Sequence, residues 1–294
     1  MAGTQARRPA APARWLAPAC LLGPALAFLL VFYLVPFGRM LLESLQPVAA
    51  SATQPGALGL EQYGKLLASG RIQRALQRTL WMSGLTTVLT LLLAYPLALY
   101  LLQVGRRMRT ALLVAVFVSL ASSLIVRNYG WLVTLSDAGP VNGLLAWLGL
   151  ADTPLRLVYS EGATIVALVH YSIPFMVLPI FASLLRIPAS LPESAQSLGA
   201  SPWKVIRQIV WPLSIPGVFG GTVLTFSLSM SAFVTPLMLG SPATSMISQV
   251  AAEQFLVQLN FPLGSAMIVV LTLLTFAIVF CYALAIRKLF RIHV

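Results

Sequence analysis

The chain has 294 residues, of which 59% are hydrophobic and only 9% are charged, with a mean hydropathy of +0.89. Soluble domains carry about a quarter of their residues as charged side chains, so this composition excludes an ordinary soluble protein. The formal charge of +12 does not indicate a nucleic-acid partner, because the basic residues are scattered between apolar segments and not gathered on one polar face.

Apolar segments long enough to cross a bilayer recur along the chain, since about 20 apolar residues are needed for one crossing. Six are expected, at residues 15–38, 80–102, 110–132, 163–185, 213–239 and 263–286. The first is too long for a signal peptide, and no small-residue cleavage site closes it. We therefore expect an all-α integral membrane protein that spans the membrane six times.

Basic residues indicate the orientation. If the tail at residues 1–14 is cytoplasmic, then 12 Lys and Arg residues lie inside and 7 outside, which together make the 19 in the chain. Cytoplasmic connections carry the excess of Lys and Arg, so both termini, including the tail at residues 285–294, are expected in the cytoplasm. Of the seven acids, only Glu193 falls on the cytoplasmic side.

A polar stretch between the fourth and fifth apolar segments predicts a helix, a turn and a second helix. Ser190 and Glu193 have the spacing of a capping box, and Gly199 suits a helix C-terminus. Ser201 and Pro202 then predict a second helix start. In the first helix Leu191, Ala195 and Leu198 fall on one face. In the second, Trp203, Ile206 and Val210 form the apolar stripe, before Pro212 interrupts the helix. An ordinary amphipathic interfacial hairpin is the alternative.

This stretch resembles the EAA loop of ABC-importer permeases, through Glu193-x-Ala195, Gly199, Ile209 and Pro212. It departs from that pattern at Ser194, where alanine is usual, and at Trp211, where leucine is common. The resemblance implies a cytoplasmic pair of coupling helices that dock on an ATPase subunit. The implied ATPase-coupling residues are Glu193, Ser194, Ala195, Gly199, Ala200 and Pro212.

Further stretches look like the spermidine/putrescine branch of these permeases. They are residues 127–131, 139–142, 173–179 and 233–240. The resemblance implies a type I permease fold, with a permease domain at residues 78–284, in a multi-pass protein of the bacterial inner membrane. The implied partners are cytoplasmic ATPase subunits, a second permease subunit, a periplasmic substrate-binding protein and membrane lipid. Polyamines or a related small solute would be the cargo.

Two other classes of protein are weighed against a permease. No glycine-rich phosphate-binding loop is present, so ATP hydrolysis is expected in a separate subunit and the chain is not expected to be an enzyme. A secondary carrier often needs a carboxylate in mid-span, and none occurs there. A membrane-embedded enzyme needs clustered His, Asp, Glu or Cys residues. His170 and His293 are far apart, and Cys20 and Cys281 have no metal spacing, so no metal site and no cofactor are expected.

Three residues are candidates for the transport pathway, namely Arg127, His170 and Tyr171. For His170 the alternative is a packed residue that forms a hydrogen bond across the helix bundle. For Arg127 the alternative is a side chain that reaches out to the outer membrane interface.

Overall fold

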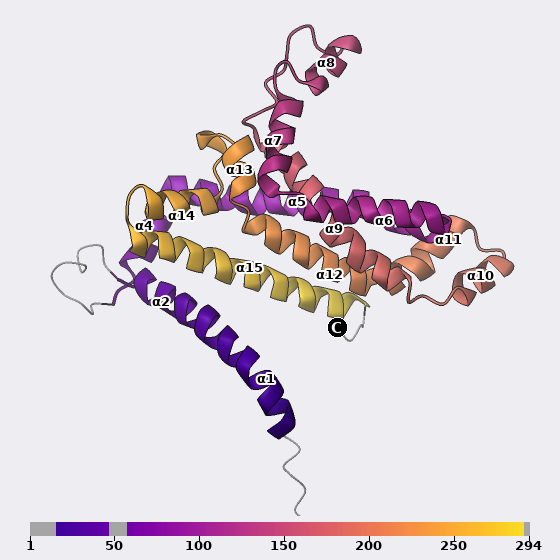
Figure 1. Ribbon diagram of the computed structural model, residues 1–294, viewed down its shortest axis with the longest axis horizontal. Coiled ribbons are helices and arrows are strands. Elements are labelled where there is room, and N and C mark those ends of the chain that lie inside the picture. The colour runs from indigo at the N-terminus through magenta and orange to yellow at the C-terminus, as the bar shows by residue number, and fades with distance from the viewer. Residues whose placement is uncertain (1–15, 47–57, 291–294) are drawn as a thin grey trace, which may run out of the picture.

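The computed structural model describes residues 16–46 and 58–290, and within them it contains helices, turns and loops but no strand. Three helices form the centre of the bundle: α5 (Gly70–Gln103), α9 (Glu161–Leu184) and α12 (Trp211–Met230). Each packs along the other two, and α15 (Phe261–Phe290) lies beside α12 (Figure 1). The predicted tail at residues 1–14 lies outside the described residues.

Five helical segments within the described residues are long and apolar enough to cross a membrane. The first consists of α1 (Leu16–Leu29), a π-helical turn η1 (Leu30–Leu34) and α2 (Val35–Ser44). Counting the bent pair that follows α5 as one crossing makes six. The all-α fold with apolar crossings is therefore as the composition predicts.

The predicted third crossing at residues 110–132 is not a single straight helix. It divides into α6 (Arg106–Ala121) and α7 (Leu124–Leu135), and the axis turns by 101° between them. Ser122 and Ser123 have extended backbones at the break, where serine side chains compete with helical hydrogen bonding. Both halves are apolar, so hydropathy cannot reveal the bend. Beyond it, α7 and α8 (Pro140–Trp147) project away from the bundle (Figure 1).

The predicted fifth crossing at residues 213–239 ends too late. The long helix stops at Met230, and residues up to Leu239 form a separate short helix, α13 (Val234–Leu239), which contains Pro236. Proline lacks the N–H that would bond back to the preceding turn, so a helix break before Pro236 leaves fewer carbonyls without partners. A 3₁₀ turn η3 (Pro242–Thr244) and helix α14 (Ile247–Leu256) then lead to α15.

Close packing of α9 against α12 depends on glycine. A Cβ added at Gly217 would lie 2.5 Å from the carbonyl oxygen of Pro179, and one at Gly221 would lie 2.8 Å from Met176 Sδ. Small residues let membrane helices approach closely and gain van der Waals contact. Gly217 and Gly221 therefore allow the close approach of α9 and α12.

The bundle has two distinct ends (Figure 1). Short helices α10 (Ser190–Ser197) and α11 (Pro202–Val205) lie at one end, together with the α5–α6 turn and the last described residues of α15. Helices α4 (Glu61–Ala68) and α14 lie at the opposite end. If both termini lie in the cytoplasm, as the distribution of Lys and Arg predicts, the α10–α11 hairpin marks the cytoplasmic end.

Candidate functional site

The cytoplasmic hairpin begins one residue earlier than its sequence indicates. Ala189 is the N-cap of α10, and its carbonyl oxygen accepts a hydrogen bond from the backbone N–H of Glu193 at 3.3 Å. Ser190 is therefore already inside the helix, and no side-chain cap forms. The predicted capping box of Ser190 with Glu193 is wrong, because a backbone bond replaces it. Glu193 still lies in the first turn, where the helix dipole favours an acid.

The turn between the two short helices is as predicted. Gly199 has φ +85°, a left-handed conformation that glycine adopts without steric cost. Its N–H bonds to the carbonyl of Gln196 at 2.9 Å, and the N–H of Ala200 bonds to that of Ala195 at 3.0 Å. This pair of bonds is a Schellman motif, which closes the helix end. Ser201 Oγ then accepts from the N–H of Lys204 at 3.4 Å and caps α11.

The prediction that Pro212 interrupts the second helix is wrong. A π-helical turn η2 (Ile206–Val210) joins α11 to α12, so one continuous helix runs from Pro202 to Met230. Within η2 the N–H of Trp211 reaches back five residues to the carbonyl of Ile206. The wider turn places Pro212 in the first turn of α12, where its missing N–H costs little.

The hairpin has a buried side and an exposed side. Ala195, Ala200 and Ile209 pack against the cytoplasmic core that includes Leu184, Val205 and Val210. Leu198 is 90% exposed and Trp203 is 71% exposed, although each belongs to the predicted apolar side of its helix. In the second short helix Val205 is buried and Trp203 is not. Glu193 and Ser194 are also exposed.

The structure therefore gathers the six predicted coupling residues at one end of the molecule. Ala195, Gly199 and Ala200 tie the hairpin to the bundle and turn it, while Glu193 and Ser194 face outward. Leu198 and Trp203 are exposed as well, although each belongs to the apolar side of its predicted helix. The only sequence signal for Leu198 is its position just before the turn glycine.

The three pathway candidates also lie together, but on α7 and α9 and not on the hairpin. The Arg127 guanidinium carbon is 5.5 Å from the centre of the Tyr171 ring. His170 Nδ1 accepts a hydrogen bond from Trp131 Nε1 at 3.1 Å. Arg127 is only 9% exposed, so its side chain does not reach out to solvent. The packed alternative for His170 and an inward position for Arg127 both agree with these contacts.

Arg127 also satisfies the backbone at the α6–α7 bend. Its Nη2 donates to the carbonyl oxygens of Ser119 and Ser122. Carbonyls at a helix C-terminus lack partners and carry partial negative charge, so a guanidinium is well suited to them. The adjacent residue joins α7 to α13, because Asn128 Nδ2 donates to Thr235 Oγ1 at 3.1 Å.

Over residues 16–46 and 58–290, no three His, Cys, Asp or Glu side chains come close enough to hold a metal ion. Cys281 is exposed, whereas the side chain of Cys20 is not among those that the structure describes.

Known proteins share this architecture. A bacterial alginate ABC transporter, solved in complex with an alginate-bound periplasmic protein, superposes with a TM-score of 0.79 at 23% identity. The alignment covers 95% of this chain and 96% of that one. The fold and the cytoplasmic hairpin together define a type I ABC-importer permease. Residues 97–291 match the family described as the binding-protein-dependent transport system inner membrane component, and the chain belongs to that family.

Curated relatives cover most of the chain. It is 29% identical over 265 residues to the spermidine/putrescine permease PotB of Haemophilus influenzae, covering 90% of this chain and 92% of the relative. It is 32% identical over 230 residues to PotB of Escherichia coli, covering 78% and 83%. The protein is thus a multi-pass permease subunit of the bacterial inner membrane and not an enzyme, which removes the secondary-carrier and membrane-enzyme alternatives.

Proposed function

We propose that this permease imports polyamines or a related small solute. The proposal draws on the two relatives named for spermidine and putrescine transport, most of whose length the chain covers. We take the permease domain to extend over residues 78–284. A second permease subunit would complete the pathway across lipid, and a periplasmic binding protein would deliver the solute.

We propose that the α10–α11 hairpin couples the permease to a cytoplasmic ATPase subunit. The observation that carries this proposal is the exposure of two large apolar side chains, Leu198 and Trp203, on the short hairpin that also carries the exposed Glu193. Aromatic and apolar side chains that are exposed beside a charged residue are typical of a protein contact. Ala195 and Ala200 pack against the core of the bundle, so a movement of the docked ATPase subunit would be transmitted through the hairpin to α12.

The pathway candidates take a supporting role in this proposal. Arg127 holds the α6–α7 bend, and its contact with Tyr171 together with the Trp131–His170 bond fixes α7 against α9. We propose that these residues position the bend next to the pathway.

Transport in a reconstituted system tests the coupling proposal. The permease, its partner permease and the ATPase are placed in liposomes with the binding protein, and uptake of labelled spermidine and solute-stimulated ATP hydrolysis are measured. Leu198→Ser and Glu193→Arg should each reduce both activities at least tenfold, because they remove an apolar contact or reverse a charge on the docking face.

Gln196→Arg is the matched control, since Gln196 is exposed on the same short helix but is not one of the proposed docking residues. It should insert, assemble and transport like the wild type. Normal uptake by Glu193→Arg and Leu198→Ser would remove the coupling assignment. Transport of a different labelled solute, with both variants still impaired, would keep the coupling assignment and move the cargo away from polyamines.

A further inference from the structure

Three arginines occupy one face at the outer end of α5. Arg71, Arg74 and Arg78 follow a spacing of three and four residues, which places side chains on the same side of a helix. Opposite them lie Pro242, Ala243, Ser245 and Val250, and together they line a pocket of about 260 Å³. Helix α14, which carries Val250, lies at the end of the bundle opposite the α10–α11 hairpin (Figure 1).

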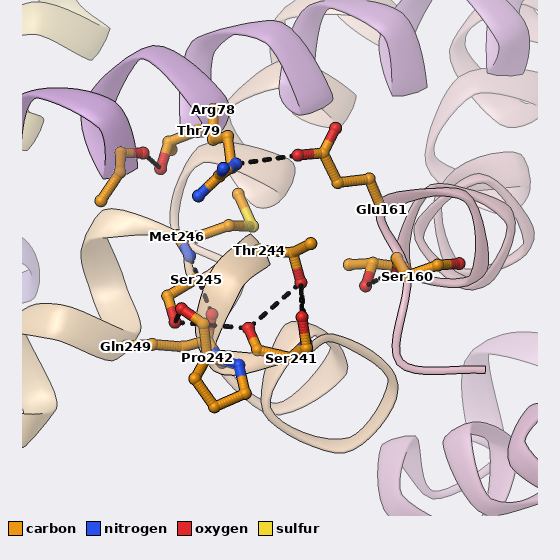
Figure 2. Close-up of polar contacts among 12 residues, drawn as sticks. Arg78, Thr79, Ser160, Glu161, Ser241, Pro242, Thr244, Ser245, Met246 and Gln249 are labelled. Carbon is orange, nitrogen blue, oxygen red and sulfur yellow. Dashed lines mark hydrogen bonds and ion pairs between the residues drawn. The ribbon is translucent and has the colours of Figure 1, made fainter. Parts of the chain in front are cut away.

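The two outer arginines of this row each hold a carboxylate. Arg71 donates from both Nη atoms to Glu253, at 3.1 and 2.5 Å, in a bidentate pair. Arg78 Nε donates to Glu161 at 2.8 Å (Figure 2). Arg74, between them, donates from Nε to the carbonyl of Gly70 on its own helix. No ion pair of Arg74 occurs among residues 16–46 and 58–290, so its charge is uncompensated there.

The wall that faces the arginines is held in place by hydrogen bonds. Thr244 Oγ1 accepts from the N–H of Ser241 at 2.7 Å, and Gln249 Oε1 accepts from the N–H of Met246 at 2.8 Å. Thr79 Oγ1 accepts from the N–H of Ile247 at 2.9 Å and ties this segment to α5. Figure 2 shows the Ser241–Ser245 segment facing the Arg78–Glu161 pair. A fixed wall reduces the ordering cost of binding.

We infer that this pocket receives a carboxylate side chain of the periplasmic binding protein, with Arg74 as its main contact. The inference rests on the proposed function, because it requires a binding protein that docks on the outer end. Arginine presents a planar fork that suits carboxylates. Both neighbours of Arg74 in the row already bind a carboxylate, Arg71 through both Nη atoms and Arg78 through Nε.

Two other occupants fit the pocket less well. A cationic solute would be repelled by an uncompensated guanidinium beside two others. Lipid phosphate is an alternative partner for an arginine near the interface, but the three side chains line a pocket whose other wall is formed by Pro242, Ala243, Ser245 and Val250. A side chain that protrudes from a docked protein can enter such a pocket from outside the membrane.

Binding of the solute-loaded binding protein to the assembled transporter tests this inference. The affinity is measured by surface-attached kinetics at low and at physiological ionic strength, in phospholipid nanodiscs and in a phospholipid-free maltoside detergent. Arg74→Glu should weaken binding about tenfold, mainly by slower association, and should remove most of the salt dependence. Hydrolysis of ATP without binding protein should stay unchanged.

Arg156→Ala is the matched control, because Arg156 is exposed before α9 and lines none of the pocket walls. It should bind like the wild type, and Arg74→Ala should be intermediate. Unchanged affinity in Arg74→Glu, with normal binding by the wild type, would overturn the inference and leave the proposed function intact. A loss confined to phospholipid nanodiscs would overturn it in favour of a lipid headgroup. Failure of the wild type to bind any binding protein would instead refute the proposed function.

Discussion

Gly217 offers the sharpest test of how the bundle is held together. It lies where α9 and α12 approach most closely, and a Cβ there would be 2.5 Å from both the Pro179 carbonyl oxygen and Ser183 Cβ. Non-bonded carbon atoms prefer a separation of about 3.5–4.0 Å, so Gly217→Ala must move the helices apart by about 1 Å. Overpacking of this size costs about 1–3 kcal/mol.

The assay is thermal unfolding of the purified protein in detergent, at one scan rate because membrane proteins often unfold irreversibly. From the usual relation between stability and midpoint, Gly217→Ala should lower the apparent Tm by about 2–10 °C. The loss should be accompanied by reduced transport, since α12 carries the coupling hairpin. Both helices also lose van der Waals contact, on which association inside a membrane depends.

Gly220 provides the control on the same helix, one turn away. A Cβ there would meet Pro179 Cβ at 3.8 Å, an ordinary contact, so Gly220→Ala should unfold like the wild type. Both substitutions replace glycine with the better helix former, so the difference between them isolates the steric effect. Equal midpoints for the two variants would refute the argument from close helix approach.

Two further predictions concern charged residues. Arg127→Ala should lower the free energy of unfolding by about 1–3 kcal/mol, because the Ser119 and Ser122 carbonyls at the bend lose their donor; a midpoint equal to that of Arg156→Ala would contradict this role. Hydrogen bonding from Arg71 lowers the pKa of the Glu253 carboxyl below its ordinary value of 4.5. A carboxyl group whose pKa is lowered in the folded state stabilises the protein at pH values above its unfolded-state pKa. This stabilisation is lost as the pH falls through the folded-state pKa. Wild type should therefore exceed Glu253→Gln in midpoint at pH 7, and this difference should close below pH 4.5; a constant difference would show that ionisation of Glu253 is not its cause.

The linear pattern of the chain predicted those features that depend on local chemistry. Long apolar runs must form helices in lipid, because only hydrogen bonding within the segment satisfies the backbone there. The Gly199 turn and the Ser201 cap are equally local, since each depends on a few neighbouring backbone groups. Family resemblance in the same polar stretch led to the permease class.

Other features depended on which residues meet across the bundle. The bend after Ala121 has no hydropathy signal, because the donor that satisfies its carbonyls is Arg127, several residues further on. The π turn before Trp211 keeps the second short helix continuous with α12, and the packing of the hairpin on the bundle leaves Trp203 and Leu198 exposed. The carboxylate partners of Arg71 and Arg78 lie 182 and 83 residues away along the chain. Only the tertiary structure could bring those charges together and leave Arg74 between them, because pairing at such separation is set by helix packing and not by sequence neighbours.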